Sequence, residues 1–427
     1  MYNNEELKRK LQGGEFNDTL KMLYGESGLY SQITRYSEAV DTFVEIFGVT
    51  EGLGLFSAPG RTEIGGNHTD HNHGKVLAGS VNMDVIAVAA KNDSNVIRLK
   101  SQGFDMSEIY LGDLTVHEED IGHSPALIRG VAAKFKEEGY EIGGFDAYTT
   151  SNVLKGSGIS SSAAFELLIS TVLNELYNDG KVSPVDQAKY AQYAENVHFG
   201  KPCGLLDQMA ASVGGIITID FEDTANPIIE KVDFDFTKSG YALCLIDTGG
   251  NHADLTDEYA AIPTEMKAVA RELGCEVLRE TTEEKVLENA AALREKLGDR
   301  AVIRALHFFE ENKRVDREIE ALNSGDFDGF LETVISSGDS SFKYLQNVFA
   351  CVSPAEQGIS LALCLAEGIL RGKGAWRVHG GGFAGTTQNF VPQDMLDDFV
   401  KRMESVFGEG KCHKLFIRPV GGIKVSK

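Results

Sequence analysis

The sequence predicts an α+β protein, because its candidate strands come in pairs and its candidate helices in groups rather than in regular alternation. A chain of 427 residues is long enough for two folding units, and we place the boundary between them near residue 222. Hydrophobic residues make up 42% and charged residues 25%, which is the balance of a globular protein with a full core.

Apolar periodicity and turn residues predict the elements along the chain. Helical spacing of apolar residues predicts a helix over residues 38–47 that ends at Gly48. Further helices are expected over residues 160–177 and 184–197, and helices dominate from 263 to 370. Strands are expected over residues 54–59, 85–90, 146–154, 216–221, 241–247, 376–379, 387–391 and 414–419.

Charge and cysteine content argue against several classes of protein. Asp plus Glu number 64 against 41 Lys plus Arg, whereas a protein that binds a nucleic-acid duplex needs a basic face. The six cysteines form no C-x-x-C pair, so we expect free thiols in a reducing compartment. The first residues are polar, unlike a signal peptide, and the longest apolar run, 85–90, is too short to cross a bilayer. We therefore expect a cytoplasmic protein without nucleic-acid or membrane partners.

A glycine- and serine-rich segment, KGSGISSSAA over residues 155–164, lies between a candidate strand and a candidate helix. Glycines let the backbone approach an anion. The unpaired amides at the start of the following helix then face that anion, with the positive end of the helix dipole behind them. The three consecutive serines add hydroxyl donors or a metal ligand. Phosphate binding and a plain turn whose serines cap the helix both fit this pattern.

A second segment, PGRTEIGGNHTDHNHG over residues 59–74, concentrates polar side chains in a glycine-rich turn. Short side chains that donate and accept hydrogen bonds suit the hydroxyls of a sugar. A metal site is the rival interpretation because His68, His71, His73 and Asp70 stand close together, although adjacent positions of an extended segment point to opposite faces. A purely structural loop is the third interpretation of this segment.

A third glycine-rich segment is VHGGGFAG over residues 378–385. It indicates close approach of the backbone to a ligand, or a tight hairpin.

In this order, the three segments resemble those of the superfamily of galactokinase, homoserine kinase, mevalonate kinase and phosphomevalonate kinase. Residues 60–72 are most similar to the galactokinase signature G-R-x-N-L-I-G-E-H-T-D-Y-N, and residues 156–164 to its phosphate loop, G-G-G-L-S-S-S-A-S. Residues 202–208, PCGLLDQ, resemble P-C-G-I-M-D-Q and are the most specific match. The resemblance begins near residue 38, so it implies an N-terminal extension over 1–37, an N-terminal lobe over 38–222 and a C-terminal lobe over 223–427. The implied fold is a two-lobed small-molecule kinase with its active site in the cleft between the lobes.

The resemblance implies a kinase that transfers the γ-phosphoryl group of ATP to the C1 hydroxyl of galactose, giving galactose 1-phosphate, with Mg²⁺ as cofactor. Asp207 would be the catalytic carboxylate facing that hydroxyl, and Arg61 would keep it ionised and stabilise charge on the phosphoryl group. Ser162 and Glu195 would bind Mg²⁺. The sugar would be held by Asn67, His68, Asp70, Gly204 and Tyr259, and the nucleotide phosphates by Gly156, Ser157, Gly158, Ile159, Ser160, Ser161 and Ser162. The implied partners are a small sugar and a nucleotide, for a monomer or weak homodimer.

The departures from the signature fall on the sugar side of the predicted site. Asn67 stands where galactokinases have a glutamate that contacts the sugar 6-hydroxyl, while Glu63 replaces an asparagine and Gly65 an isoleucine. Because an amide can donate to a carboxylate that glutamate would repel, a galacturonate kinase is the alternative. Asn67→Glu should then be tolerated with galactose and not with a uronate. A catalytically silent sugar-sensing regulator, a further alternative, would be expected to lack part of the phosphate loop or Asp207, and both are present.

Overall fold

The computed structural model of the chain describes residues 1–153, 158–250 and 255–427. The larger sheet is formed by β1 (Gly54–Gly65), β2 (Lys75–Lys91), β3 (Val96–Ser101), β4 (Met106–Tyr110), β5 (Phe145–Ser151), β6 (Ile216–Asp220), β7 (Ile228–Val232) and β12 (Ile423–Lys424). The smaller sheet is formed by β8 (Tyr241–Asp247), β9 (Ala375–His379), β10 (Thr386–Pro392) and β11 (Cys412–Leu415). The helices are α1 (Asn4–Gly13), α2 (Asn17–Phe47), α3 (Ser124–Glu137), α4 (Ser161–Tyr177), α5 (Pro184–Tyr193), α6 (Leu206–Val213), α7 (Thr256–Glu272), α8 (Glu283–Glu288), α9 (Ala290–Leu297), α10 (Asp299–Ser324), α11 (Phe327–Ser340), α12 (Gly358–Leu370) and α13 (Leu396–Phe407).

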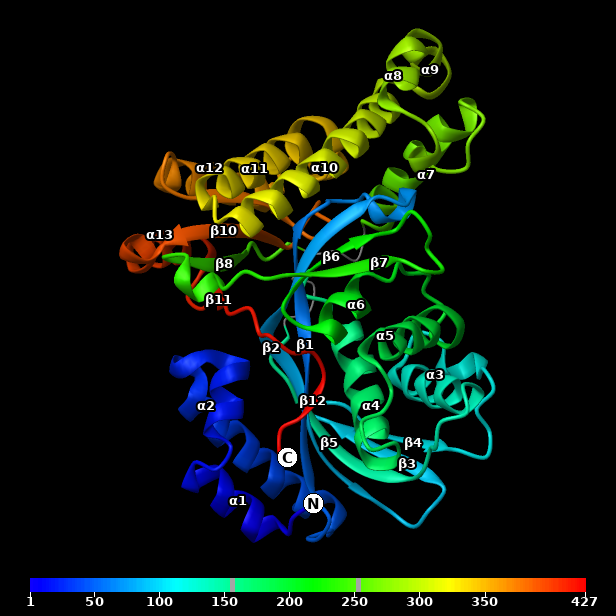
Figure 1. The fold of residues 1–427 in the computed structure, drawn as a ribbon, viewed down its shortest axis with the longest axis vertical. Helices are drawn as coiled ribbons and strands as arrows, with labels where there is room; N and C mark the ends of the chain where they lie inside the picture. The colour runs from blue at the N-terminus through cyan, green and yellow to red at the C-terminus, as the bar shows by residue number, and fades with distance from the viewer. Residues whose placement is uncertain (154–157, 251–254) are drawn as a thin grey trace.

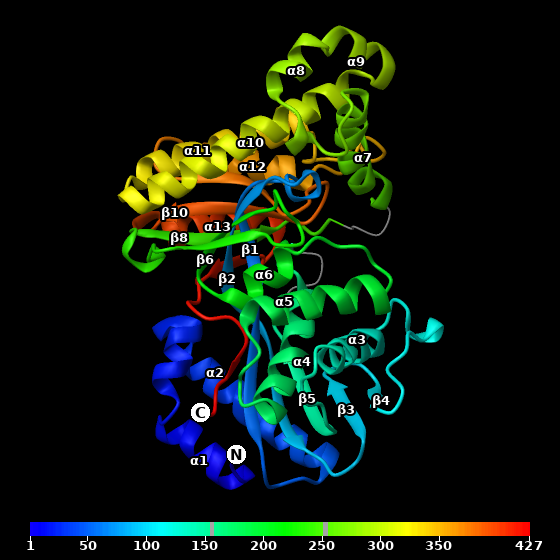
Figure 2. The same ribbon diagram turned by 45° about the vertical axis from the view of Figure 1, so that its right-hand side comes forward.

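In Figure 1, β3, β4 and β5 lie with α1 to α5 in the lower half of the molecule, and the smaller sheet lies with α10 to α13 in the upper half. The larger sheet has the order β12-β1-β2-β5-β3-β4, with β6 beside β2 and β7 beside β6. The smaller sheet has the order β11-β8-β10-β9 and lies under α10, α11 and α12 (Figure 2). Strand pairs are antiparallel except for β3 with β5. The predicted α+β class is confirmed.

The long strands β1 and β2 run from the lower half into the upper half (Figure 1). They are longer than the predicted strands over 54–59 and 85–90, because the pairing of β1 with β2 continues to Gly65. The first residues of β2 also pair with β6, which satisfies their backbone groups on both edges despite the many glycines nearby. The predicted final strand over 414–419 instead ends at Leu415, and Ile417 forms only an isolated bridge with Val81.

Different helices cover the two faces of the sheet around β1, β2 and β5. Phe56 and Ala87 belong to the core cluster that contains residues of α3 and α4. Their strand neighbours Leu55 and Val88, with Tyr148, belong to the cluster that contains α1 and α2. This alternation is the two-residue period of a strand. The N-terminal helices therefore bury a sheet face that would otherwise contact water.

A buried carboxylate, Asp84 of β2, ties the N-terminal extension to the rest of the chain. Arg35 Nη1 lies 2.7 Å from Asp84 Oδ1, and the Tyr24 hydroxyl donates to Oδ2 at 2.5 Å. Arg418, near the C-terminus, lies 3.6 Å from the same carboxylate. Beyond residue 222, β7 continues the larger sheet, and β12 pairs with β1. The division of the chain at residues 37 and 222 stays a prediction.

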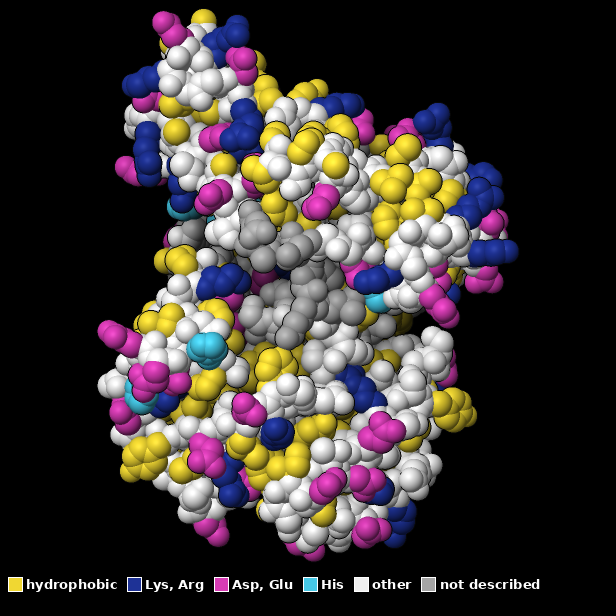
Figure 3. Space-filling view, turned by 180° about the vertical axis from the view of Figure 1, so that it is seen from behind, with side chains coloured by type: hydrophobic (Ala, Val, Ile, Leu, Met, Phe, Trp, Pro, Cys, Tyr) yellow, Lys and Arg dark blue, Asp and Glu magenta, His cyan; other side chains and the backbone are white. Residues whose placement is uncertain are grey.

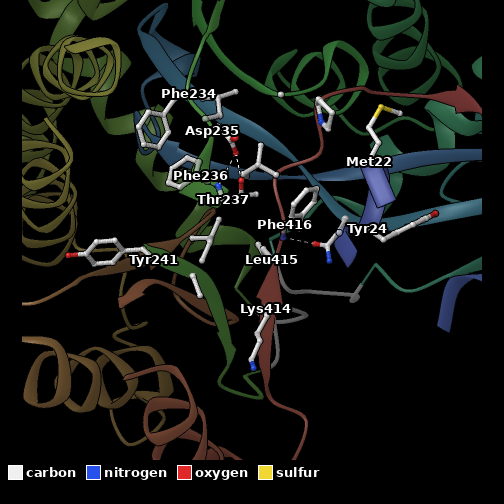
Figure 4. Close-up of a pocket in the computed structure, with 18 of the residues that line it drawn as sticks. Met22, Tyr24, Phe234, Asp235, Phe236, Thr237, Tyr241, Lys414, Leu415 and Phe416 are labelled. Carbon is white, nitrogen blue, oxygen red and sulfur yellow. Dashed lines mark hydrogen bonds between the residues drawn. The ribbon is translucent and has the colours of Figure 1, made fainter. Parts of the chain in front are cut away.

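A cavity of about 990 Å³ lies where the N-terminal helices, the segment between β7 and β8 and the C-terminal segment meet (Figure 4). Phe234, Phe236 and Phe416 lie on its wall together with Met22 and Tyr24 of α2. None of the residues predicted to bind sugar, nucleotide or metal lines it, within the described ranges. The N-terminal extension therefore lines a cavity that is separate from the predicted site.

The molecule is less wide between its two halves than within either half (Figure 3). Acidic and basic side chains are interspersed over the face in this view. All six cysteines are free, as predicted. In the part of the chain that the structure describes, no helix is both long enough and apolar enough to cross a membrane.

Candidate active site

The three glycine-rich segments of the sequence come together in the structure. A side chain at Gly60 would overlap Ile159, and the Arg61 amide donates to the Ile159 carbonyl at 2.9 Å. A Cβ on Gly380 would lie 3.3 Å from the Cα of Gly158. The end of β1, the start of α4 and the turn after β9 therefore meet through their backbones, and the glycines permit this approach.

Arg61 and Asp207 form an ion pair at this meeting point. Asp207 lies in the first turn of α6, and its Oδ1 accepts from Arg61 Nε at 2.8 Å and from Nη2 at 2.5 Å. The third guanidinium nitrogen, Nη1, donates to the Gly158 carbonyl. Burial raises the pKa of Asp207, but Arg61 and the Ser160 hydroxyl hold it below its ordinary value. The carboxylate is therefore ionised at neutral pH, and its side chain is still 33% exposed.

The start of α4 lies beside Asp207, because the Ser160 hydroxyl hydrogen-bonds that carboxylate. Ser160 precedes the helix with a positive φ of 62°, and its side chain makes no capping bond to the helix. The amides of Ser161 and Ser162 open a helix of 17 residues whose first turn holds no acidic side chain. Such an end attracts an anion. Of the predicted phosphate loop, Gly156 and Ser157 lie outside the described residues.

Ser162 and Glu195 meet next to this helix end. Glu195 lies in the turn Ala194–His198 that follows α5, and its Oε1 accepts from the Ser162 hydroxyl and from Lys201 Nζ, each at 3.1 Å. Gln208 donates to Glu195 at 2.7 Å and to Glu166 at 3.2 Å. Glu166 Oε1 is buried and has no partner among the described residues. Mg²⁺ binds to oxygen ligands such as the Ser162 hydroxyl and the Glu195 carboxylate. The Glu195 carboxylate already contacts one positive charge, that of Lys201. The two residues are therefore chemically suited to the predicted Mg²⁺ site.

A cavity of about 220 Å³ opens beside Asp207. Its wall is formed by Arg61, Glu63, His68, Asp70, His71, Pro202, Cys203, Gly204, Leu206, Asp207, Gly380 and Gly381. The structure thus brings His68, Asp70 and Gly204, three of the predicted sugar ligands, to the same space as the ion pair. A Cβ on Gly204 would lie 2.8 Å from Asp70 Oδ2, so an alanine there would press on that carboxylate.

His68 faces the cavity as a neutral ring. Burial lowers its pKa to about 4, so it carries no charge at pH 7. Its Nε2 donates to the Gly381 carbonyl at 2.9 Å, which leaves Nδ1 as an acceptor. Among the residues that the structure describes, no group of three or more His, Cys, Asp or Glu side chains could hold a metal ion, and the histidines of this turn are no exception.

Asn67 is a predicted sugar ligand that the structure does not bring to the cavity wall. It is fully buried. Its amide nitrogen donates to Glu63 at 2.9 Å and to the Gly380 carbonyl at 2.8 Å. Its oxygen accepts from Asn347 at 2.9 Å and from Ser341 at 3.2 Å. A glutamate at position 67 would meet the Glu63 carboxylate whatever the substrate, so Asn67→Glu is a poor test of galactose against galacturonate.

Tyr259 lies behind the third glycine-rich segment. Its hydroxyl donates to the Gly382 carbonyl at 2.7 Å, and a Cβ on Gly381 would lie 2.5 Å from its ring. It does not line the cavity beside Asp207. The side chain of Tyr259 therefore supports the glycine turn from the side of α7.

Two functional features were absent from the predicted site. Glu63 lines the cavity, and Arg377 Nη2 lies 3.1 Å from its Oε1. Burial raises the pKa of Glu63 to about 7, although Arg377 and Arg61 act in the opposite direction. The second feature is Glu318 of α10, which fills the space that a side chain at Gly65 would need. Both features coincide with departures from the signature, at positions 63 and 65, and those departures were the available signal.

Glu318→Gln is expected to stabilise the protein increasingly as pH rises. Burial, with Glu311 and Glu63 nearby, raises the pKa of Glu318 well above 4.5 despite the charges of Arg377 and Arg314. Above pH 4.5 the unfolded chain releases this proton and the folded chain keeps it, so the wild type loses stability with rising pH. Relative to wild type, the unfolding free energy of the variant should grow by up to about 1.4 kcal/mol per pH unit.

Urea unfolding between pH 5 and 8 measures this difference. Glu320→Gln, an exposed position on the same helix, is the control and should follow the wild-type curve. If the unfolding free energies of wild type and Glu318→Gln depended on pH in the same way, the raised pKa of Glu318 would be contradicted.

Comparisons with known proteins agree with this geometry. A family model described as the galactokinase galactose-binding signature matches residues 41–91, and one described as the GHMP kinases N terminal domain matches residues 126–215. The galactokinase of Streptomyces coelicolor is 31% identical over 369 residues, which cover 86% of this chain and 92% of that protein. The galactokinase of Bacillus subtilis is 27% identical, with 86% and 92% covered.

Solved structures give the same picture of the fold. The crystal structure of Lactococcus lactis galactokinase complexed with galactose matches with a TM-score of 0.78 at 24% identity, covering 91% of this chain and 99% of that one. Methanococcus jannaschii mevalonate kinase matches with a TM-score of 0.62 at 13% identity, covering 85% and 98%. At these identities the likeness establishes the fold.

Proposed function

Because the chain belongs to the galactokinase family, it is an ATP-dependent sugar kinase that phosphorylates the C1 hydroxyl of galactose, and we propose that Asp207 and Arg61 carry the transfer. The observation that carries this assignment is their ion pair, with both nitrogens within 2.8 Å of Asp207 Oδ1, at the mouth of a cavity and beside the start of α4. Arg61 also donates to the Gly158 carbonyl and Asp207 accepts from the Ser160 hydroxyl, so both members of the pair contact the described part of the phosphate loop.

The transfer follows from the charges of this site. The C1 oxygen of galactose attacks the γ-phosphorus, and the bond between that phosphorus and the oxygen bridging to the β-phosphate breaks, releasing ADP. The hydroxyl proton passes to the Asp207 carboxylate. Because Arg61 and Ser160 favour the ionised form, Asp207 is ready to accept that proton, and it orients the hydroxyl before the proton moves. The guanidinium group of Arg61 also stabilises the negative charge of the phosphoryl group in the transition state of the transfer.

His68, Asp70 and Gly204 are proposed to hold the sugar, and the segment Gly156–Ser162 to hold the nucleotide phosphates. Ser162 and Glu195 would hold Mg²⁺, since their oxygens meet at 3.1 Å beside the helix start that faces the phosphates. When bound, the ion supplies positive charge to the phosphates next to the transferred group. The amides of Ser161 and Ser162 contribute donors at the start of α4.

Glu195→Ala is expected to raise the Mg²⁺ concentration for half-maximal activity by roughly 10- to 100-fold, the loss seen when a group supporting a metal is removed. Titration of activity with Mg²⁺ at saturating ATP measures it. Lys201→Ala is the matched control, because Lys201 competes for the same oxygen of Glu195. An unchanged requirement in Glu195→Ala, or an equal rise in both variants, would contradict the metal assignment.

An ADP-release assay against a panel of hexoses and uronic acids tests the function itself. We expect turnover with galactose. Release of ADP with uronic acids alone would favour the galacturonate alternative, and silence with every sugar would favour a regulator. Within the described residues, no contact singles out either alternative.

We further propose that the protein acts in the cytoplasm as a monomer or weak homodimer. All six thiols are free, which suits a reducing compartment. The residues proposed to carry the transfer, Asp207 and Arg61, lie together on one chain.

A further inference from the structure

Glu63 is the carboxylate on β1 that reaches the cavity beside Asp207. Its side chain is almost entirely buried in the protein, and the cavity is the open space next to it. Asn67, four residues along the chain, is fully buried and does not line the same cavity. Of these two side chains, only Glu63 can therefore touch a bound sugar.

One oxygen of Glu63 is held by the protein and the other is not. Oε1 accepts from Asn67 Nδ2 at 2.9 Å and from Arg377 Nη2 at 3.1 Å. Among the described residues, none forms a hydrogen bond with Oε2. Arg377 is fully buried, so it fixes the carboxylate from the protein side. Since Glu63 lines the cavity, its second oxygen is available as an acceptor for the hydroxyl of a ligand.

The spacing on β1 places Glu63 at the end of the sugar far from the phosphorylated hydroxyl. Arg61 and Glu63 pair with Ser80 and Ala78 in regular register, so their side chains lie on the same face of the strand. Two residues of a strand span roughly 7 Å. With Arg61 and Asp207 at C1, this distance carries Glu63 past the ring to the C4 and C6 hydroxyls.

The sequence differs from the signature at the positions of both Glu63 and Asn67. The signature has asparagine at the position of Glu63 and glutamate at the position of Asn67, so the two residue types are exchanged. The exchange keeps one carboxylate and one amide in hydrogen-bond contact, at 2.9 Å. It moves the carboxylate to the position that reaches the cavity in this chain.

We propose that Glu63 is a specificity-determining residue that accepts a hydrogen bond from the C4 or C6 hydroxyl of galactose, with Asn67 and Arg377 as positioning residues that hold it. This inference rests on the proposed function. It also explains why a neutral sugar is the substrate, because Glu63 and Asp70 both line the cavity. Because burial raises the pKa of Glu63 to about 7, this side chain is mostly ionised only above that pH. An ionised Glu63 and a uronate carboxylate about 4 Å apart at an effective dielectric near 20 repel strongly enough to lower affinity roughly a thousandfold. We therefore expect a uronic acid to be rejected at pH 8.

The test measures kcat/KM at pH 8, where Glu63 is mostly ionised, for galactose, 4-deoxygalactose and 6-deoxygalactose in wild type and Glu63→Gln. A hydrogen bond to a charged group contributes about 10- to 100-fold. Wild type should lose that factor on one of the two deoxy sugars. Glu63→Gln should lose it on galactose but lose little more on that same deoxy sugar, since the partner hydroxyl is already gone. Glu108→Gln, an exposed carboxylate on β4, is the control and should behave as wild type.

An equal loss on all three sugars in Glu63→Gln would overturn the proposal, since a residue with only a structural role affects every substrate alike. A second arm needs no variant: at pH 8, wild type should use galacturonate about a thousandfold less efficiently than galactose, and comparable efficiency would also overturn the proposal. Loss of galactose phosphorylation by wild type itself would instead overturn the proposed function, so the two failures are distinguishable. ATP binding and the thermal midpoint of each variant verify folding.

Discussion

Asp207→Asn is expected to lower kcat by about 100- to 10,000-fold, the usual contribution of a positioned general base. Asparagine nearly matches aspartate in shape and keeps an oxygen for Arg61, which now bonds Oδ1 at 2.5 and 2.8 Å. It cannot accept the hydroxyl proton. Galactose and ATP should still bind, and steady-state kinetics with calorimetric titration of each ligand measure both effects.

Asp223→Asn is the control for this change, because Asp223 is an exposed aspartate outside the cavity. It should keep the kcat of the wild type. Near-normal turnover in Asp207→Asn would show that the proton goes elsewhere.

Arg61→Met is expected to lower kcat/KM by about 100- to 1,000-fold, the loss typical of one donor that stabilises transition-state charge. The substitution removes both bonds to Asp207 and the bond to the Gly158 carbonyl. Because burial raises the pKa of Asp207 and Arg61 counteracts it, the pKa of Asp207 should rise in the variant. The acid limb of the pH–rate profile should therefore move to higher pH, and profiles from pH 4.5 to 8 measure the shift.

Arg61→Lys separates charge from geometry. Lysine keeps the positive charge but not the fork of donors, so it should restore the acid limb more fully than the rate. An acid limb that stays in place in Arg61→Met would contradict the role of Arg61 in keeping Asp207 ionised.

Short apolar runs were the most predictable part of the fold. The predicted strand over 241–247 has the bounds of β8, because Tyr241–Asp247 lies between β10 and β11 and its middle is buried. The length of β2 was not predictable, since its first residues, up to Gly79, are paired by β6, which comes more than a hundred residues later. Gly79 and the polar residues that follow it show no local strand pattern, and only the tertiary pairing makes them part of a strand.

The N-terminal extension shows the same limit. Apolar residues at helical spacing predicted the last part of α2, but the helix begins at Asn17 and bends at Gly25. Its buried contacts with Asp84 and with the sheet face of Leu55 join segments far apart in the sequence. Local periodicity does not contain those contacts.

Within the site, the pairing of Arg61 with Asp207 could be predicted because both residues lie in segments that resemble motifs of the family, and the resemblance implied that they are neighbours. The residue that reaches the sugar cavity could not be predicted in this way. The sequence pointed to Asn67 as the residue that differs from the family, whereas the structure buries Asn67 and leaves Glu63 on the cavity wall. The sequence gives the residue types at positions 63 and 67. The contacts of Glu63 with Arg377 and of Asn67 with Asn347 decide which of the two side chains reaches the cavity.

Incubation of the protein with ATP and an equimolar mixture of galactose and galacturonate, with the products followed by phosphorus and proton NMR, tests the assignment most directly. A C1 phosphate on galactose, formed in step with ADP, is the expected product, with galacturonate left unchanged and with Asp207→Asn giving no product on the same time scale. Phosphorylation of galacturonate in preference to galactose, or of a galactose hydroxyl other than C1, would contradict it.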